Sequence, residues 1–185
     1  ETLKSAQLGG NFATARMTVE TALIDAIARS LGQSVYTLLS VGHVEPPLSI
    51  SYGKSIAEVD SGKTFTEIEG AIYRGAKRIK LKISPMSFDA VYRAIKKTKA
   101  YHKNVDIMVD ANGTFDPDDS DHIQKLQALD ATGLLMIEEP VSRHGPKRGL
   151  DAHRALQHNH SFVTPIAIDD AINTLGDAEA ALLES

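Results

Sequence analysis

A short apolar run that stops at a glycine or a charged residue recurs about every 30 residues, and this spacing constrains the fold more than any other feature. The runs end at Gly53, Lys82, Asp110, Glu138 and Asp169, at intervals of 29, 28, 28 and 31 residues. A strand, a helix and two short loops occupy about 30 residues, which is the length of one βα unit. Five such units in succession predict an α/β fold.

Two α/β architectures use this unit, the (β/α)8 barrel and the doubly wound sheet. No G-x-G-x-x-G turn follows the first run, which disfavours the dinucleotide-binding sheet. We therefore predict a partial TIM-type (β/α)8 barrel, with residues 46–185 forming about its first five units and residues 1–45 forming a helical segment before it. Eight units need about 240 residues, so we expect the C-terminal units and a capping domain to be absent from this chain.

The segment before the predicted barrel has the pattern of two helices. Apolar residues recur at four-residue spacing through residues 14–31, and Gly32 is placed to end that helix. A shorter helix is expected at residues 36–39, and Pro46 and Pro47 mark the boundary with the barrel.

The predicted barrel elements follow from apolar runs and from helix start signals. Thr64 with Glu67 has the spacing of a capping box, Ser87 is a candidate N-cap, and Asp116 followed by Pro117 is typical of a helix start. The expected strands are residues 48–52, 78–83, 105–112, 134–140 and 165–170, and the expected helices are residues 64–75, 87–95, 116–129, 150–156 and 177–183.

The second strand, RIKLKI, has two chemically different faces. Ile79, Leu81 and Ile83 alternate with Lys80 and Lys82, and successive side chains of a strand point to opposite faces. If a helix covers the apolar face, both lysines point into the middle of the barrel. A lysine in a dry site beside a like charge loses affinity for its proton and can act as a base.

Carboxylates follow the next three strands at matching places. Asp110, Glu138 and Asp169 would converge, because parallel strands bring their C-terminal ends to one rim. Three converging carboxylates repel one another unless a cation lies between them. Hard oxygen ligands favour Mg²⁺ or Mn²⁺ over zinc, so the sequence predicts a divalent-metal site.

Composition excludes several classes of protein. The net charge of −4 argues against a nucleic-acid-binding surface, and the absence of cysteine excludes disulfides and zinc–thiolate sites. No run approaches the roughly 20 apolar residues of a membrane span. We therefore expect a cytoplasmic protein that acts on a small molecule, with no nucleic-acid or membrane partner. The open strand edges of a partial barrel would favour a homo-oligomer.

Four short motifs together resemble the enolase superfamily, and within it the muconate-lactonising subgroup. They are K-L-K at residues 80–82, D-A-N at 110–112, E-E-P at 138–140 and I-D-D at 168–170, in that order and spacing. The helical segment at residues 13–39 is also similar to the segment that precedes the barrel in that family. The RIKLKI form is most similar to o-succinylbenzoate synthases and N-acylamino acid racemases.

The resemblance implies a role for each motif residue. Asp110, Glu138 and Asp169 would bind Mg²⁺, Lys82 would remove the proton α to a carboxylate, and Lys80 would support the negative charge that develops on the substrate. The metal would neutralise the charge on the carboxylate oxygens, which makes a weakly acidic proton removable.

Two further positions complete the implied site. Asn112 would lie behind the metal ligands or beside the substrate, and Asp170 stands where the family more often has glutamate. The family's second catalytic lysine lies on the sixth strand, beyond Ser185. We therefore expect the 185 residues alone to be inactive.

Three functions remain open on this evidence. The first is a Mg²⁺-dependent lyase that makes o-succinylbenzoate for menaquinone synthesis. The second is a racemase or epimerase that acts on N-acylamino acids or dipeptides with the same residues. The third is a non-catalytic barrel piece with a structural or binding role.

Overall fold

The computed structural model describes residues 13–40, 49–57, 63–141, 150–172 and 174–183. The chain divides into two compact units, Glu1–Ile50 and Ser51–Ser185, and each is considered by itself. In the part of the chain that is described, no helix is both long enough and apolar enough to span a membrane. The expected boundary at Pro46 and Pro47 lies outside the described residues.

The first unit contains the two helices that the sequence predicts. Helix α1 spans Ala13–Ser30 and helix α2 spans Val35–Leu39. Gly32 has a φ of 62°, a left-handed conformation that glycine adopts at little cost, and it follows the end of α1. Helix α2 begins after Ser34, whose Oγ accepts a hydrogen bond from the backbone N–H of Thr37 at 3.0 Å.

The second unit is a parallel sheet with its strands in chain order. The strands are β1 (Gly53–Ile56), β2 (Arg78–Lys82), β3 (Asp106–Asp110), β4 (Ile137–Glu138) and β5 (Ile166–Ala167), and each pairs with the next. A doubly wound sheet would reverse its strand order at a switch point, and these strands do not. The order is that of a barrel wall, as the sequence predicts.

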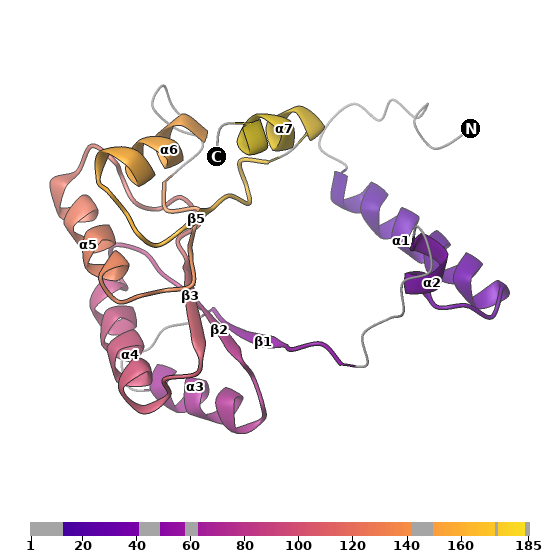
Figure 1. Cartoon of the computed structure of the whole chain (residues 1–185), viewed down its shortest axis with the longest axis horizontal. Helices are drawn as coiled ribbons and strands as arrows, with labels where there is room; N and C mark the ends of the chain where they lie inside the picture. The colour runs from indigo at the N-terminus through magenta and orange to yellow at the C-terminus, as the bar shows by residue number, and fades with distance from the viewer. Residues whose placement is uncertain (1–12, 41–48, 58–62, 142–149, 173, 184–185) are drawn as a thin grey trace. The chain divides into compact units, whose positions relative to one another are not determined.

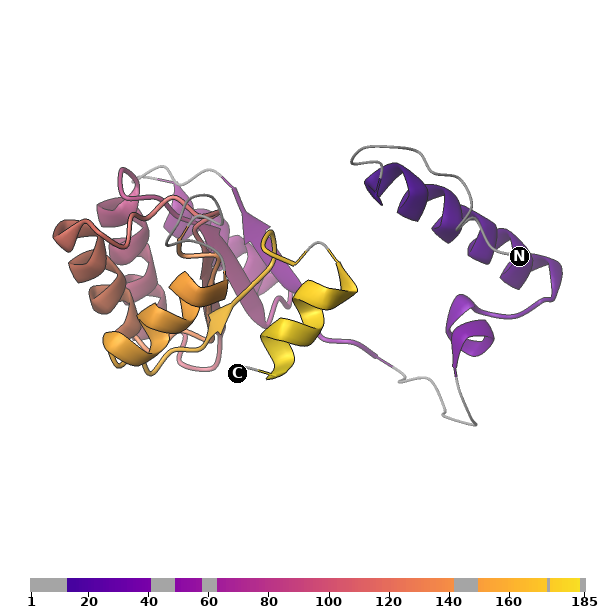
Figure 2. The ribbon, with the colours of Figure 1, turned by 90° about the horizontal axis from the view of Figure 1, so that it is seen from above.

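Helices connect the strands and cover one face of the sheet. They are α3 (Thr64–Tyr73), α4 (Phe88–Tyr101), α5 (Ser120–Asp130) and α6 (Leu150–Asn159), and α7 (Leu175–Leu183) follows β5. Figure 1 shows α3 to α6 on the same side of the strands, and Figure 2 shows α4 to α6 on that side from above. The opposite face of the sheet is therefore left for polar side chains.

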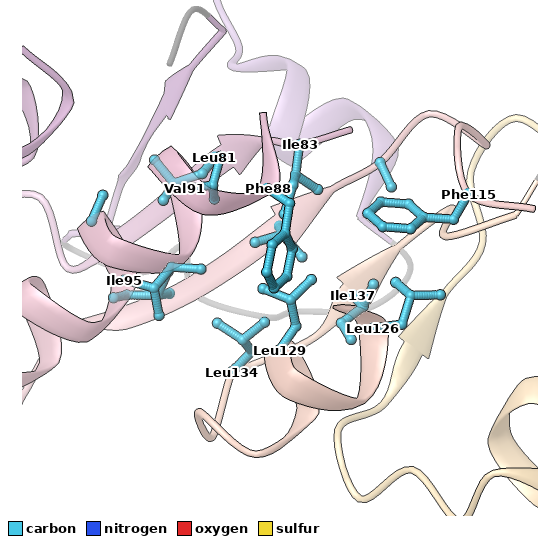
Figure 3. Packing of buried hydrophobic residues seen from close by; sticks show 14 of the residues in the cluster. Leu81, Ile83, Phe88, Val91, Ile95, Phe115, Leu126, Leu129, Leu134 and Ile137 are labelled. Atoms are coloured by element: carbon cyan, nitrogen blue, oxygen red, sulfur yellow. The ribbon is translucent and has the colours of Figure 1, made fainter. Parts of the chain in front are cut away.

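The core lies between the sheet and these helices. Ile79 and Leu81 of β2 are fully buried, and Val91 and Ile95 of α4 pack in the same apolar cluster (Figure 3). Leu129 of α5 belongs to the cluster as well. The alternation of RIKLKI therefore places its apolar face against the helices, as predicted, because burying each such side chain contributes about 1.5–3 kcal/mol.

The structure corrects two predicted element boundaries. The predicted first strand at residues 48–52 is wrong, because β1 begins at Gly53, where that strand was expected to end. Tyr52 lies before β1 and donates a 2.5 Å hydrogen bond from its hydroxyl to the carbonyl of Arg74. Helix α5 begins at Ser120 rather than near Asp116, because the carboxylate of Asp119 accepts from the backbone N–H of Asp121 at 2.8 Å. The hydrogen bonds that Asp119 accepts from the backbone N–H groups of Asp121 and His122 lower its pKa.

Two predicted caps are wrong, and the later strands are shorter than predicted. Lys63 precedes α3 and Thr64 lies inside it, so the capping box is not formed. Ser87 does precede α4, but among the described residues its hydroxyl accepts from the N–H of Ser84 rather than capping the helix. Strands β4 and β5 have two residues each, because the flanking residues of the apolar runs leave the ladder.

We expect Leu81→Ala to destabilise the natural full-length protein by about 2–5 kcal/mol, because it removes three buried carbons between the sheet and its helices. Met86→Ala, which trims a 97% exposed side chain in the following loop, should change the free energy of unfolding by less than about 0.5 kcal/mol. Urea denaturation of both variants measures the difference. Equal losses of unfolding free energy in the two variants would contradict the assignment of Leu81 to the core.

Candidate active site

The strand register places the charged residues of three strands next to one another. Lys82 of β2 pairs with Asp110 of β3, and Asp110 pairs with Glu138 of β4. All three lie at the C-terminal ends of their strands, on the face away from the core cluster. Asp110 is 1% exposed and Glu138 is 8% exposed, so these carboxylates need partners within the protein.

Lys80 joins two of the carboxylates. Its Nζ lies 2.8 Å from Oδ2 of Asp110 and 2.7 Å from Oε1 of Glu138. Burial opposes the ammonium form, but the hydrogen bonds to both carboxylates outweigh it and raise the pKa of Lys80. Lys80 is therefore a permanent positive charge between Asp110 and Glu138 at neutral pH.

Lys82 lies nearer the open end of the site. Its Nζ donates to Oδ2 of Asp110 at 2.5 Å and to Oδ1 of Asn112 at 2.8 Å. Asn112 has a φ of 45°, and its backbone N–H donates to Oδ1 of Asp110 at 3.1 Å. The D-A-N turn thus directs the Asn112 amide toward Lys82, a contact that the sequence pattern alone does not specify.

Asp110 receives the largest number of hydrogen bonds in this group. Burial would raise its pKa, but hydrogen bonds from Lys80, Lys82 and the backbone of Asn112 outweigh burial and lower it. Asp110 is therefore ionised at neutral pH. An ionised, buried carboxylate at a strand end is the donor that a hard cation requires.

The third predicted ligand lies apart from the first two. Glu138 pairs with Ala167, the last residue of β5, so Asp169 lies two residues beyond the end of that strand, and both Asp169 and Asp170 are exposed. Among the described residues, no group of three or more Asp, Glu or His side chains is close enough to hold a metal ion. The structure brings Asp110 and Glu138 together with both lysines, and the roles of Asp169 and Asp170 stay predictions.

One residue that the sequence reasoning did not assign to the site is Glu139. It is 2% exposed, with a φ of 41°. Oε1 accepts from the backbone N–H of Asp169 at 2.7 Å and of Ala171 at 2.9 Å, and Oε2 lies 3.3 Å from Nε2 of the buried His153 in α6. Burial would raise the pKa of Glu139, but His153 and these two N–H groups outweigh burial and lower it.

The signal for Glu139 was present in the sequence. It follows Glu138 directly, so the sequence shows two adjacent carboxylates at a strand end. Glu139 itself lies beyond β4 with a φ of 41°, and its buried carboxylate lies 3.3 Å from Nε2 of His153 in the covering helix.

The donors that converge fit a divalent cation such as Mg²⁺. Asp110 and Glu138 offer only carboxylate oxygens, and one Nζ lies within hydrogen-bond distance of both. A single positive charge can therefore contact both carboxylates at once. Oxygen-only donors suit Mg²⁺ better than zinc.

We expect Lys80→Met to cost roughly 3 kcal/mol of unfolding free energy in chelator-treated protein, because it leaves two buried carboxylates without their shared cation. Lys82→Met is the matched control and should cost less, since its side chain is 35% exposed and Lys80 still neutralises Asp110. Urea denaturation at neutral pH measures both. A larger loss from Lys82→Met would contradict the central position of Lys80.

The chain is similar to known proteins in sequence and in fold. Residues 64–185 match the family model described as enolase C-terminal domain-like. An o-succinylbenzoate synthase from Geobacillus stearothermophilus is 32% identical over 168 residues, which cover 91% of this chain and 41% of that protein. An N-succinylamino acid racemase from Thermus thermophilus is 27% identical over 168 residues, which cover 91% of this chain and 42% of the racemase.

A solved structure shows the same fold. The crystal structure of an enolase superfamily member from Listeria innocua matches with a TM-score of 0.70 and 26% sequence identity, covering 90% of this chain and 41% of that chain. The chain thus spans about two fifths of the length of the relatives that it matches. The family model, the sequence relatives and the fold agree, and the chain belongs to the enolase superfamily.

Proposed function

We propose that this chain carries part of the active site of a Mg²⁺-dependent lyase of the o-succinylbenzoate synthase type. The observation that carries the proposal is the cluster of Lys80, Lys82, Asp110 and Glu138, which places two cationic side chains and two carboxylates on one face of three adjacent strands. The substrate class is a small carboxylate whose α-carbon bears a removable proton.

Asp110, Glu138 and Asp169 are the proposed metal ligands. A bound Mg²⁺ would supply positive charge where the substrate carboxylate becomes more negative during proton removal. Asp110 and Glu138 meet the requirement for buried, oxygen-only donors. Asp169 follows the next strand and is exposed, so its carboxylate is accessible from solvent.

Lys82 is the proposed base. To take the α-proton, its Nζ must present a free lone pair to the substrate, so its contact with Asp110 Oδ2 must be given up when Asp110 binds a cation. Asn112 then remains as a hydrogen-bond partner that holds Nζ near the site. Lys80 is proposed to act as an ammonium that stabilises the negative charge developing on the substrate.

The lyase reaction removes one water in total. The α-proton passes to Nζ of Lys82, the C–O bond to the hydroxyl group on the neighbouring carbon breaks, and a double bond forms between the two carbons. The departing hydroxide takes up the proton held by Lys82, so water is released and the neutral amine is restored. The relative with 32% identity carries this activity in its name, which supports the lyase over other outcomes of the same proton transfer.

The second candidate is a racemase that acts on an N-acylamino acid. It is favoured by the Thermus thermophilus relative, an N-succinylamino acid racemase with 27% identity. Both reactions begin with the same proton transfer. Assaying the natural full-length protein with the cyclohexadiene carboxylate precursor of o-succinylbenzoate, and separately with an N-succinylamino acid, distinguishes the two.

We expect the natural full-length protein to bind Mg²⁺, and Glu138→Gln to abolish binding that calorimetry can detect, because glutamine removes one of two buried anionic donors. Glu67→Gln, a substitution in the first turn of α3, is the control and should leave the affinity unchanged. Equal binding by wild type and Glu138→Gln would remove Glu138 from the metal site.

We expect Lys82→Ala to slow exchange of the substrate α-proton with deuterated solvent by roughly 10²–10⁴-fold, because the side chain that accepts the proton is gone. Metal affinity should fall by far less than in Glu138→Gln, since Lys82 is not a ligand. NMR follows the exchange. Unchanged exchange would assign the base to another residue.

A further inference from the structure

Glu139 connects the ends of three strands. Its backbone N–H donates to the carbonyl of Ala167 in β5 at 2.9 Å, and its own carbonyl accepts from the N–H of Gly113 at 2.7 Å, immediately after the D-A-N turn. Its carboxylate accepts from the N–H groups of Asp169 and Ala171. One residue thus contacts the chain that follows Asp110 and the chain that follows β5.

The left-handed backbone conformation of Glu139 costs free energy, which its contacts must offset. A non-glycine residue in the left-handed region costs about 1–3 kcal/mol, and such residues persist where the surroundings determine them. Glu139 is also buried, so its carboxylate must be fully hydrogen-bonded. The backbone N–H groups of Asp169 and Ala171 donate to Oε1, and Nε2 of His153 lies 3.3 Å from Oε2.

We propose that Glu139, held by His153, is a positioning residue that fixes the backbone of Asp169 and thereby sets the place of the third metal-ligand carboxylate. This inference rests on the proposed function, since it gives Asp169 the role of a ligand. Strand β5 has only two residues, so the ladder ends before Asp169 and cannot hold it. The two hydrogen bonds that Oε1 accepts from Asp169 and Ala171 hold the backbone beyond the strand end.

A matched control exists at the other end of the same strand. The carboxylate of Asp130 in α5 accepts from the N–H groups of Val163 and Thr164, the latter at 2.6 Å, just before β5. Asp130 and Glu139 are therefore both carboxylates that anchor backbone next to β5. Only Glu139 anchors the end that carries Asp169.

The test is Mg²⁺ affinity of the natural full-length protein, measured by calorimetry beside thermal stability. We expect Glu139→Ala to raise the dissociation constant about 10–100-fold, the usual effect of losing a group that orients a ligand. Glu139→Gln keeps a carbonyl oxygen that can accept from both N–H groups, so it should lose much less Mg²⁺ affinity. Asp130→Ala should lower stability without changing the affinity.

A double-mutant cycle identifies the route of the effect. If Glu139 acts through Asp169, adding Glu139→Ala to Asp169→Asn should weaken binding no further, whereas independent effects would add. Amide hydrogen exchange at Asp169 and Ala171 should accelerate in Glu139→Ala and stay unchanged in Asp130→Ala. If the alanine variant fails to fold, Glu139→Asp replaces it, because its shorter carboxylate recedes from both N–H groups and should weaken binding likewise.

The outcomes separate the two proposals. Absence of Mg²⁺ binding in the wild type would overturn the proposed function and this inference together. Wild-type binding that Glu139→Ala or Glu139→Asp leaves unchanged would overturn the inference alone. Equal loss of affinity in Asp130→Ala and Glu139→Ala would also overturn it, because anchoring either end of β5 would then suffice.

Discussion

The ammonium of Lys80 between Asp110 and Glu138 is the interaction on which the polar face of the sheet depends. Adjacent strands in parallel register bring two carboxylates side by side at the same depth, and both are nearly inaccessible to solvent. Two buried negative charges on adjacent strands would repel each other and favour protonation of one carboxylate. Lys80 contacts both, so the sheet can hold two adjacent carboxylates at its C-terminal end.

The same strand that supplies this charge also anchors the core. Alternation along β2 sends Ile79 and Leu81 to the helices and Lys80 and Lys82 to the polar face. The position of the lysines is therefore fixed by the packing of their neighbours, and not by the charges alone. Rigid placement of this kind is what the proposed proton transfer would require, because a catalytic side chain displaced by about 1 Å loses much of its contribution to the rate.

The pattern of the sequence predicted what depends on period and spacing. The 30-residue repeat predicted parallel strands in chain order, and the alternation of β2 predicted the face of each lysine. Local hydrogen bonds decided the rest. Asp119 rather than Asp116 starts α5, and Tyr52 lies outside β1. Both outcomes depend on which backbone group a polar side chain reaches, and residue type alone does not specify that.

The role of Glu139 was hidden for a related reason. A sequence shows that two glutamates are adjacent, but whether the second is solvated or buried depends on a helix that begins eleven residues later. His153 lies in that helix, and its contact with Oε2 leaves Oε1 for the backbone after β5. The adjacent glutamates therefore have different contacts. Glu138 contacts Lys80 on the polar side of the sheet, while Glu139 contacts His153 in α6 and the backbone that follows β5. Two adjacent residues at the end of β4 thus connect the polar side of the sheet with the helices that cover its core.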